Sequence, residues 1–600
     1  MIRVADYITK KLVDYGVKDI FMISGGGAIF LNDAVGRTSG LSYICNQHEQ
    51  SSSMAAEGYA KSTGKLAVVC VTTGPGGTNT ITGLMGQWLD STPVLYLSGQ
   101  VKYPTTIASC PELGLRQLGD QEINIIDVVR PLTKYAKMIT SPEEIKIELD
   151  KAIQIALEGR QGPVWLDIPI NIQSALIEEE ELKDQVGLPQ GDSKGEGLEE
   201  KIMQIIELLK KAKRPLILAG HGIRMGGAID LFEKFKEVVS VPIVSSFNGF
   251  DLMTTEDELF VGRVGTIGDR GGNFALQNAD LLLCLGTRNN IRQVGYNWED
   301  FAARATKVVV DIDEKELNKP TVKPDIPIHM DVKYFLEIFL KKVQLEELPG
   351  WNEWKSWCRD KKNRYPVVLE DYKKQTVINP YYFVEELSHR LKEKEIVITG
   401  NGTCSVCYFQ AGVVKKGQRV IWNSGCASMG YDLPTAIGAA VAHPSKRVIC
   451  LAGDGSLQMN IQELETLKYY NLPVKLFILD NQGYISIKQT QDNLFEGFKV
   501  ASDPLHGVGI PDFKKIAEAY GIKTRVIQST SEFYKLDEVL EEEGPVVCVV
   551  KLQTDYIFSP KSASKKLEDG SIVSMPLDDM FPFLEREEYE SNQIKEERDR

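Results

Sequence analysis

Residues 447–483, RVICLAGDGSLQMNIQELETLKYYNLPVKLFILDNQG, decide how the rest of the chain is interpreted. Two short apolar runs, 447–452 and 474–479, predict buried strands, and apolar residues at helical spacing predict a helix over 460–470 between them. A strand, a helix and a second strand in this order are typical of a parallel sheet. The strands of such a sheet end at one edge, where open α/β folds bind their ligands.

Polar residues follow both predicted strands. Asp454 follows the first and Asn481 the second, so both side chains are expected at the ligand-binding edge. A carboxylate, an amide oxygen and nearby loop carbonyls are hard oxygen ligands that suit an octahedral Mg²⁺ holding a diphosphate. Gly453 and Gly455 allow backbone N–H groups to approach a phosphate at the start of the helix. The alternative is an ordinary strand-to-helix turn that Asp454 caps.

The whole stretch resembles the diphosphate–magnesium signature of enzymes that depend on thiamine diphosphate (ThDP), and residues 453–464 resemble the acetolactate synthase branch of that family. The resemblance implies ThDP and Mg²⁺ as cofactors. The family signature usually ends in Asn-Asn, whereas position 480 is Asp here and the ligating Asn481 is kept. The resemblance assigns the metal to Asp454, Asn481 and Gly483, and the cofactor to Gly453, Gly455 and Ser456.

Two motifs in the first 180 residues resemble the pyrimidine-binding domain of the same branch: His48-Glu49-Gln50 and 74-GPGGTN-79. The resemblance implies that Glu49 activates the cofactor, whose C2 proton leaves with the help of a carboxyl group on the aminopyrimidine ring nitrogen. A glutamate in a partly apolar, dry site can share that proton. Taken alone, Glu49 also fits an exposed charge at a helix start.

The same segment contains three further expected site residues. The resemblance assigns Gly26 and Asn79 to the cofactor and Gln121 to the substrate side. The aromatic residue that usually precedes this Gln in the family is absent from 119-GDQE-122.

The run 281-LLLCLGTR-288, with Arg292, resembles the flavin-binding middle domain of acetolactate synthases. The surrounding strands and helices are spaced as in a Rossmann-type domain, without its GxGxxG fingerprint. The resemblance implies FAD, held by Gly286, Arg288 and Arg292. The paired acids that the family carries before the second Arg are replaced by 290-NI-291, and the alternative is an empty or altered nucleotide pocket.

The stretch 424-SGCASMGYDL-433 resembles the segment that supports the bent cofactor in this family. The resemblance implies that Met429 is the apolar wedge under the V-shaped ThDP and that the Ala427 carbonyl holds the pyrimidine amino group. Gly402, in the turn 399-TGNG-402, is expected to face the ligand. A buried core position is the commoner place for a lone Met.

The chain is therefore predicted to form three doubly wound parallel-sheet α/β domains of the ThDP-enzyme type, with sites at the subunit interfaces of a homodimer or homotetramer. The charged, Gly-rich run 178–199 is typical of a linker. The expected segments are a pyrimidine-binding domain (1–180), a linker and middle domain (181–345), a connector (346–375), a diphosphate-binding domain (376–555) and a C-terminal tail (556–600). The tail is interpreted either as a lid over the site or as a segment packed on the surface.

Composition restricts the class of protein further. A formal net charge of −14 argues against broad binding to nucleic acid or to anionic membranes. The ten cysteines show no disulfide pattern, and the single CxxC, Cys404 to Cys407, lacks the partners of a zinc site. No apolar run is long enough for a bilayer and the N-terminus lacks the order of a signal peptide, so we expect a cytoplasmic protein.

One position separates this chain from the acetolactate synthases. Thr490 stands where they carry a Trp that shapes the acceptor pocket, and a smaller residue leaves room for a larger or more polar acceptor. The C-terminal tail, together with 290-NIRQ-293, resembles the ThDP enzymes of branched-sugar and surface-polysaccharide pathways. Lys488 and Arg116 are candidates for binding a phosphate on such an acceptor.

The predicted function is a ThDP- and Mg²⁺-dependent carboligase. It decarboxylates a 2-keto acid, with pyruvate as the expected donor, and transfers the acyl unit to a carbonyl acceptor, expected to be a nucleotide-linked keto sugar. The alternatives are acetolactate synthase itself, a simple 2-keto acid decarboxylase, and an inactive ThDP-fold protein that binds a partner. Retention of Glu49, Asp454 and Asn481 argues against the last of these.

Overall fold

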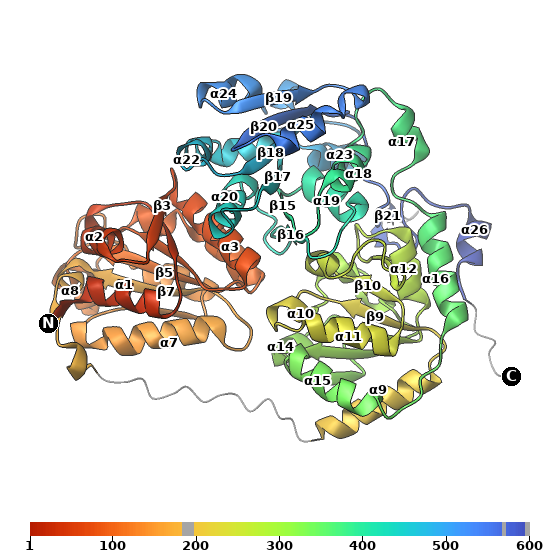
Figure 1. The fold of residues 1–600 in the computed structure, drawn as a ribbon, viewed down its shortest axis with the longest axis horizontal. Helices are drawn as coiled ribbons and strands as arrows, with labels where there is room; N and C mark the ends of the chain where they lie inside the picture. Colours follow the sequence, from red (N-terminus) through yellow and green to blue (C-terminus); the bar gives the residue numbers. More distant parts are fainter. Residues whose placement is uncertain (183–196, 567–571, 595–600) are drawn as a thin grey trace. The chain divides into compact units, whose positions relative to one another are not determined.

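The computed structural model describes residues 1–182, 197–566 and 572–594 (Figure 1). Most of the expected linker at 178–199 lies outside these residues. Three six-stranded sheets form the framework, and the strands within each of them pair in parallel. The predicted fold class, three parallel-sheet α/β domains, is confirmed. Within the described ranges, every helix falls short of the length and apolarity that a membrane span needs.

The N-terminal sheet is covered by helices on both faces, so its central strands are buried along their whole length. In spatial order its strands are β3 (Ser42–Cys45), β2 (Asp19–Met22), β4 (Ala67–Val71), β5 (Val94–Gln100), β7 (Val164–Pro169) and β6 (Tyr135–Met138). One face packs against α1 (Val4–Asp14), α2 (Ile29–Arg37) and α7 (Ile145–Leu157). The other packs against α3 (Glu49–Thr63), α5 (Ile81–Leu89) and α6 (Ile125–Val129). A short antiparallel pair, β1 (Ile2–Arg3) and β8 (Leu176–Ile177), joins the two ends of this domain.

The C-terminal sheet repeats the strand order of the N-terminal one. Its strands are β16 (Arg419–Ile421), β15 (Ile396–Thr399), β17 (Val448–Gly453), β18 (Val474–Asp480), β20 (Val546–Lys551) and β19 (Lys523–Ile527). Its helices are α20 (Asp432–Ala442), α21 (Asp454–Leu457), α22 (Glu463–Tyr469), α23 (Ile485–Leu494), α24 (Phe513–Ala519) and α25 (Lys535–Glu541). In the N-terminal sheet, β2 pairs with β3 on one side and with β4 on the other. In the C-terminal sheet, β15 pairs in the same way with β16 and β17. Ligand-binding loops are therefore expected after β2 and β4, and after β15 and β17.

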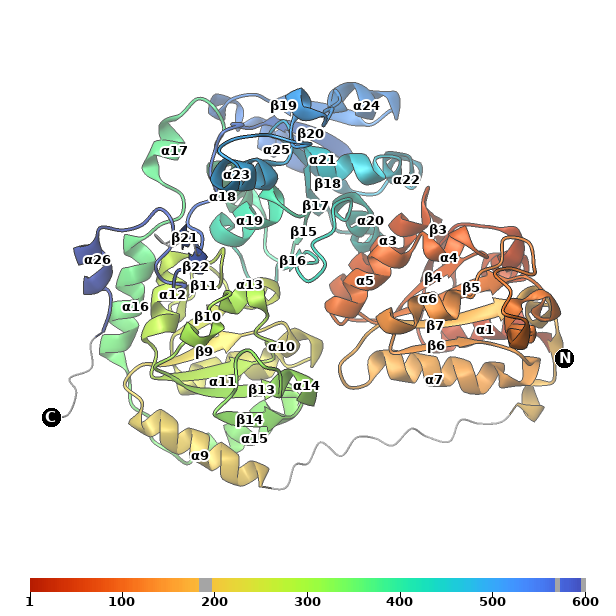
Figure 2. The same ribbon diagram turned by 180° about the vertical axis from the view of Figure 1, so that it is seen from behind.

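The N-terminal and C-terminal domains share a core through α3 and α20, which lie side by side in both views (Figures 1 and 2). Glycine makes this close approach possible. A Cβ at Gly438 of α20 would lie 1.8 Å from the carbonyl oxygen of Ala55, and a Cβ at Gly58 of α3 would lie 2.1 Å from that of Thr435. The two helices thus touch backbone to backbone.

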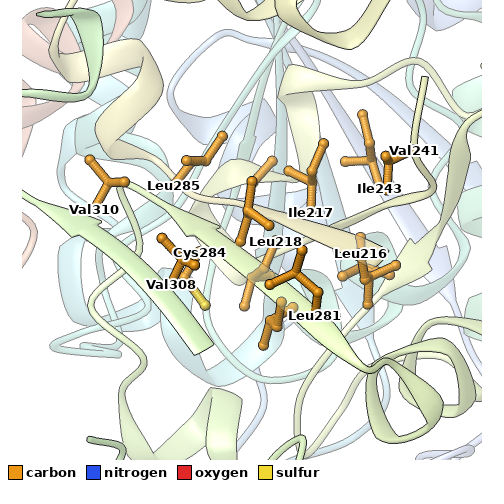
Figure 3. Close-up of a cluster of buried hydrophobic side chains, with 14 of the residues drawn as sticks. Leu216, Ile217, Leu218, Val241, Ile243, Leu281, Cys284, Leu285, Val308 and Val310 are labelled. Carbon is orange, nitrogen blue, oxygen red and sulfur yellow. The ribbon is translucent and has the colours of Figure 1, made fainter. Parts of the chain in front are cut away.

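The middle sheet has a different strand order, that of a Rossmann domain. It runs β11 (Phe260–Arg263), β10 (Ile243–Ser245), β9 (Pro215–Ala219), β12 (Leu281–Leu285), β13 (Thr306–Asp311) and β14 (Ile326–His329). Its central strands carry the apolar cluster in Figure 3, including Leu216, Ile217, Leu218, Leu281 and Leu285. The helices that follow along this part of the chain are α9 (Leu198–Lys211), α10 (Gly222–Met225), α11 (Ile229–Val239), α12 (Arg270–Asn278), α13 (Ile291–Val294), α14 (Glu314–Leu317), α15 (Val332–Val343), α16 (Asn352–Arg364), α17 (Glu370–Lys374), α18 (Pro380–Arg390) and α19 (Thr403–Ala411).

The C-terminal tail packs on the middle domain. The side-chain amide of Asn273 on α12 donates to the carbonyl of Leu577 at 3.0 Å, and the Arg270 guanidinium donates to that of Met580 at 3.3 Å. Leu577 and Met580 are buried. The tail also contains β21 (Ser564–Lys566), β22 (Ile572–Ser574) and α26 (Arg586–Ser591).

The helix expected over 460–470 is divided. It consists of α21, a 3₁₀ turn at Gln458–Asn460, and α22, which begins at Glu463. The break lies at Asn460, whose side chain makes two long-range hydrogen bonds. Its Nδ2 donates to the carbonyl of Gly430 at 2.7 Å, and its Oδ1 accepts a hydrogen bond from the Ser51 hydroxyl at 3.0 Å. Contacts with distant parts of the chain thus replace the local helical continuation.

Candidate active site

Asp454 begins α21 directly after β17, and its carboxylate is buried. One oxygen accepts the N–H of Gly455 at 2.7 Å, and the other accepts those of Asn481 at 3.1 Å and Gly483 at 3.0 Å. These bonds join the ends of two neighbouring strands, because β17 pairs with β18. Burial raises the pKa of Asp454 to about 6, and the backbone hydrogen bonds from Gly483 and Gly455 act against this rise. The carboxylate is therefore held in place before any ligand arrives.

The turn after β18 is fixed from two sides. The side-chain amide of Asn481 donates to the hydroxyl of Thr403 at 2.9 Å, and both residues are buried. Gly483 has a φ of 117°, and a Cβ there would lie 2.4 Å from the carbonyl oxygen of Ser502, so only glycine fits. The expected metal ligands Asp454, Asn481 and Gly483 thus come together at one edge of the sheet.

The donor set at this edge fits Mg²⁺. It offers one carboxylate, one side-chain amide and backbone oxygens, which a small hard cation prefers. Among the described residues, no three His, Cys, Asp or Glu side chains gather as a metal site. A divalent cation here would therefore depend on Asp454, Asn481 and the oxygens of a bound diphosphate, as Mg²⁺ sites on phosphorylated ligands commonly do.

Two further strand-end turns are built for close approach. A Cβ at Gly455 would lie 2.2 Å from the ring of Tyr484, whereas a Cβ at Gly453 would meet only the Ser456 side chain, at 3.7 Å. Gly402, after β15, has a φ of 85°, and nothing lies within 4 Å of a Cβ placed there. Both Gly453 and Gly402 could admit a ligand close to the backbone. Ser456 is buried, and its hydroxyl donates to Asp432 at 2.6 Å and accepts the N–H of Gly430 at 2.8 Å.

Residues 422–431, which we call the support loop, contain Ala427 and Met429. Asn401 holds this loop to the end of β15, since its side-chain amide donates to Asn423 and to the carbonyl of Ser428, both at 2.7 Å. Ala427 is exposed and has a φ of 54°, an uncommon backbone conformation for a residue with a Cβ. Met429 is half-buried rather than part of the core. The loop therefore presents a strained alanine and a partly open methionine.

The N-terminal domain brings Glu49 and Asn79 together. Glu49 begins α3, and its carboxylate accepts the side-chain amide of Asn79 at 3.0 Å. His48 caps the same helix, because its Nδ1 accepts the N–H of Gln50 at 3.1 Å. Helix position and hydrogen bond together fix the direction of the carboxylate, while Glu49 remains half-exposed and accessible to a ligand.

Gly26 and Gln121 lie on loops at the same sheet edge as the Glu49 carboxylate. Gly26 begins a short turn after β2, and the N–H of Gly27 donates to the Thr72 hydroxyl at 3.1 Å after β4. Gln121 has a φ of 58°, and a Cβ at Gly74 would lie 2.2 Å from its carbonyl oxygen. The backbone of Gln121 therefore packs on the Gly-rich turn that leads to Asn79.

In the middle domain, glycines pack against each other at the point where the strand order reverses. A Cβ at Gly220, after β9, would lie 2.2 Å from the carbonyl oxygen of Gly286, after β12. Gly286 has a φ of 60°. Arg288 is half-buried nearby in sequence, and Arg292 is exposed, with its guanidinium 5.7 Å from the ring of Phe247. Cationic groups beside a glycine turn fit a phosphorylated ligand.

The residues proposed for acceptor binding have varied surroundings. Thr490 is exposed on α23, and its hydroxyl donates to the carbonyl of Ser486 at 2.9 Å within the same helix. Lys488 is half-buried, and burial lowers its pKa, although Asp503 and Asp454 act in the opposite direction. Arg116 is exposed. Lys488 is thus electrostatically linked to the metal-site carboxylate.

Several residues of this site escape a motif search. Asp432 is fully buried beside Ser456, and burial raises its pKa to about 6 while the Ser456 hydroxyl lowers it. Thr403, Asn401 and Asn423 position the turns through long-range hydrogen bonds. The only local signal is for Asp432, an acid at the start of an otherwise apolar helix, DLPTAIGAAVA.

Comparisons with known proteins match three segments of the chain to one family. Residues 2–123 match the family described as "Thiamine pyrophosphate enzyme, N-terminal TPP binding domain", residues 202–339 match its central domain, and residues 400–550 match its C-terminal TPP binding domain. Thiamine pyrophosphate is another name for ThDP.

Individual relatives are similar over nearly the whole chain. The acetolactate synthase large subunit of Lactococcus lactis subsp. lactis is 32% identical over 546 residues, covering 90% of this chain and 91% of the relative. The probable acetolactate synthase large subunit of Methanocaldococcus jannaschii is 33% identical over 576 residues, covering 94% and 93%. Acetolactate synthase 2, chloroplastic, of Nicotiana tabacum is 31% identical over 551 residues, covering 90% and 81%. The chain therefore belongs to the thiamine pyrophosphate enzymes, as a ThDP-dependent enzyme related to the acetolactate synthase large subunits.

Proposed function

We propose that this enzyme is an Mg²⁺-dependent carboligase that decarboxylates a 2-keto acid, with pyruvate as donor, and transfers the acyl unit to a carbonyl acceptor. The observation that carries the proposal is the buried Asp454 carboxylate, held by the N–H groups of Asn481 and Gly483 at two adjoining strand ends. Bound ThDP would supply the nucleophilic carbon and the electron sink that let the bond between the keto and carboxylate carbons of the substrate break. Carbon dioxide leaves, and a new carbon–carbon bond joins the acyl unit to the acceptor.

The residues of the chain have separate parts in this proposal. Asp454, Asn481 and the Gly483 carbonyl hold Mg²⁺, with Gly453, Gly455, Ser456 and Gly402 forming the backbone cradle of the diphosphate. Glu49 would hold the proton of the aminopyrimidine ring nitrogen, because the hydrogen bond from Asn79 fixes the position of its carboxyl group. Gln121 orients the substrate. The Ala427 carbonyl and the Met429 side chain set the position of the cofactor's two rings.

We also propose that the site is completed by a second copy of the chain, in a homodimer or a homotetramer. Glu49 then acts on a cofactor held by the Asp454 edge of the partner subunit, as the resemblance to ThDP enzymes implies. Supporting this, the helix and loop beyond Asn481 expose apolar side chains that mark subunit interfaces on many proteins. They include Ile487, Leu494, Phe495, Phe498 and Leu505. The domain boundaries expected from the sequence remain part of this proposal.

A structural FAD in the middle domain is a further part of the proposal. Arg288 and the exposed Arg292 would bind its phosphates beside the tight turn in which Gly286 packs on Gly222. The Rossmann strand order supports a nucleotide at this sheet edge but does not by itself choose the ligand.

Two acceptors are favoured by different observations. The names of the relatives favour a second molecule of the keto acid, which is the reaction of an acetolactate synthase. Thr490, in place of the aromatic residue of those enzymes, favours a larger polar acceptor such as a nucleotide-linked keto sugar. We propose the keto sugar.

Product analysis tests the donor and the acceptor together. The purified enzyme is incubated with ThDP, Mg²⁺ and pyruvate, with and without keto sugars, and the products are identified by mass spectrometry. A sugar lengthened by an acetyl unit supports the proposal. Acetolactate as the dominant product at saturating keto sugar contradicts the acceptor, and acetaldehyde alone identifies a simple decarboxylase.

A pair of substitutions separates the size of Thr490 from its hydroxyl. Thr490→Trp should shift acceptor choice toward pyruvate by roughly 10- to 200-fold, the range that one hydrophobic contact provides. Thr490→Val keeps the size and should leave acceptor choice unchanged, since the hydroxyl already donates to Ser486. An unchanged product ratio in Thr490→Trp removes the role given to this position.

A further inference from the structure

A cluster of buried charges lies where α3 meets the support loop. The Lys61 ammonium group is 2.7 Å from Oε1 of Glu57 and 2.8 Å from Oδ2 of Asp90. The three side chains are 4%, 0% and 2% exposed. Burial alone would lower the pKa of Lys61, but Asp90 and Glu57 raise it above its ordinary value, so the ammonium group stays charged. The cluster is outside the set of residues assigned to the metal, cofactor or substrate.

The same ion pair holds both ends of the support loop. Lys61 donates to the backbone carbonyl of Trp422 at 2.8 Å, and Trp422 is the first residue of the loop. The Tyr431 hydroxyl donates to Oε1 of Glu57 at 3.2 Å, and Tyr431 is the last residue of the loop. The Lys61 nitrogen also lies 5.8 Å from the centre of the Tyr431 ring. Two residues one helical turn apart on α3 thus fix where the loop leaves the sheet and where it rejoins α20.

The cluster has an energetic cost that stability alone does not explain. Oε2 of Glu57 is buried and lacks a hydrogen-bond partner within the described part of the chain. A Cβ at Gly86 would lie 3.0 Å from that oxygen and 3.4 Å from the Asn423 side-chain nitrogen, so α5 also approaches closely here. Unpaired buried polar atoms are costly, and apolar side chains of similar size often replace buried ion pairs without loss of stability. A positioning role accounts for polar groups at this place.

The loop that is held this way needs external constraint. Ala427, between the two anchored ends, has a φ of 54°, and such strained residues persist only where their surroundings over-determine them. Asn423 adds one constraint inside the loop, donating to the Ser428 hydroxyl at 3.0 Å. The anchoring helix is also the one that begins at Glu49.

We propose that Glu57 and Lys61 are positioning residues that hold the support loop in the conformation in which Ala427 and Met429 meet the cofactor. Because α3 carries both Glu49 and this ion pair, one helix then sets the direction of the activating carboxylate and the shape of a cofactor-supporting loop. The inference rests on the proposed role of the support loop in ThDP binding.

The test compares ThDP binding with stability in the full-length enzyme. Lys61→Met removes the charge at nearly constant length, and Lys61→Arg restores a charged donor. The matched control is Arg447→Met, which breaks the part-buried ion pair between Arg447 and Glu395. These two residues lie at the N-terminal ends of β17 and β15, at the sheet edge opposite to the ligand-binding one. For each variant the thermal midpoint, the half-saturating ThDP concentration at fixed Mg²⁺, and the rate at saturating ThDP are measured.

We expect Lys61→Met to raise the half-saturating ThDP concentration by about 10- to 100-fold, the range seen when partners that orient a ligand-binding group are removed. Lys61→Arg should recover part of this loss. Arg447→Met should lower the thermal midpoint without changing ThDP half-saturation. Equal ThDP half-saturation in wild type and Lys61→Met overturns the inference, whatever happens to the midpoint.

Tyr431→Phe covers the case in which Lys61→Met fails to fold, because it deletes one hydroxyl and keeps the ring. A lost hydrogen bond of this kind should raise half-saturation by roughly 2- to 10-fold, and no change overturns the inference. If the wild type itself binds no ThDP, the proposed cofactor site fails and this inference fails with it. Normal wild-type binding with unaffected variants overturns the inference alone.

Discussion

The C-terminal and middle sheets each contain six parallel strands and end in glycine turns, yet they offer opposite charges to a ligand. The C-terminal sheet ends in the buried carboxylate of Asp454. The middle sheet ends near Arg288 and the exposed guanidinium of Arg292. A carboxylate suits a cation, and guanidinium groups suit a phosphate. The fold therefore gives the place for a ligand, and the few polar side chains at the strand ends choose its chemistry.

The two edges also use their backbones differently. In the C-terminal sheet, the N–H groups of Asn481 and Gly483 hold the side chain of Asp454. In the middle sheet, Gly220 and Gly286 pack against each other, with only 2.2 Å between a Cβ at Gly220 and the carbonyl oxygen of Gly286. The first edge is preorganised around one functional group, whereas the second is closed by backbone contact. Substitutions should accordingly have larger effects at the first edge.

The largest expected effect follows from Asp454→Ala. Removing the buried carboxylate eliminates the charged metal ligand and leaves the N–H groups of Asn481 and Gly483 without their acceptor. Titration calorimetry should show that Mg²⁺-dependent ThDP binding is lost, while FAD content in the middle domain is unchanged. Unaltered ThDP affinity would contradict the metal assignment.

Asp480→Asn is the matched control for this change. Asp480 is also a buried aspartate, one residue before Asn481, but it is paired with Lys551 and Gln482. The substitution creates the Asn-Asn ending usual in the family, and we expect ThDP binding to be retained. Loss of binding in both variants would show that any change of charge at this edge is sufficient to abolish ThDP binding.

Glu49→Gln should separate chemistry from binding. The amide keeps the size of the side chain and its contact with Asn79, so ThDP and Mg²⁺ should still bind to the C-terminal sheet. Exchange of the cofactor C2 proton, followed by NMR, should slow by roughly 10²- to 10⁴-fold, the usual contribution of a general acid or base. Glu143→Gln, an exposed glutamate of the same domain, should exchange at the wild-type rate. Full-rate exchange in Glu49→Gln would remove the activating role of this carboxyl group.

The quaternary proposal is tested with the same pair of variants. If Glu49 acts on the partner's cofactor, mixing Glu49→Gln with Asp454→Ala should restore part of the activity, because a hybrid dimer contains one site with both residues intact. A mixture as inactive as its components, although hybrid dimers are detected by mass spectrometry, would place both residues of a site on one chain.

Much of the fold follows from local patterns. The strand at Leu281–Leu285 coincides with an apolar run that is bounded by a polar residue and a glycine. The predicted strand over 474–479 extends by one residue, to Asp480, whose charge hides a buried position. The short edge strands give no comparable pattern. Tyr135–Met138 is only half-buried, and Arg419–Ile421 has three residues, the first of them charged.

The parts of the site that local patterns miss depend on long-range contacts. Thr403 meets Asn481 across 78 residues of sequence, and Asn460 interrupts the helix after Asp454 through bonds to Ser51 and Gly430. Such partners are defined only after the sheets assemble. The resemblance to a family supplied the roles of Glu49 and Asp454, whereas Glu57 is visible only through its burial.

A smaller effect is expected at the middle sheet. Arg292→Ala should weaken FAD binding by roughly 10- to 150-fold, the equivalent of about 1.5–3 kcal/mol for one hydrogen bond to a charged group. The purified variant should have lost its flavin absorbance and recover it at high added FAD. Arg359→Ala, at an exposed arginine of α16, is the control and should keep its flavin. A wild-type protein that neither contains nor takes up FAD would leave this edge without its proposed ligand.

The smallest expected effect is a pH dependence of thermal stability, which only the C-terminal edge should show. Burial raises the pKa of Asp454 from its ordinary value of 3.8 to about 6. Between these values the folded, metal-free protein binds a proton that the unfolded chain has released, so this group stabilises the fold at lower pH. Its contribution is lost as pH rises through about 6, where the buried carboxyl group must ionise. Asp454→Asn cannot ionise and therefore lacks this dependence.

The thermal midpoint of the metal-free protein is measured across this pH range, and the midpoint of Asp454→Asn is subtracted from that of the wild type. The other buried acids, such as Asp432, cancel in the difference. The wild-type midpoint should fall by a few degrees relative to the variant as pH rises. Added Mg²⁺ and ThDP should reverse the trend, because a bound cation favours the ionised carboxylate. A difference that is flat in the metal-free protein would mean that the backbone N–H groups already offset the cost of burying the charge. The edge would then be preorganised for the ionised form even before a metal binds.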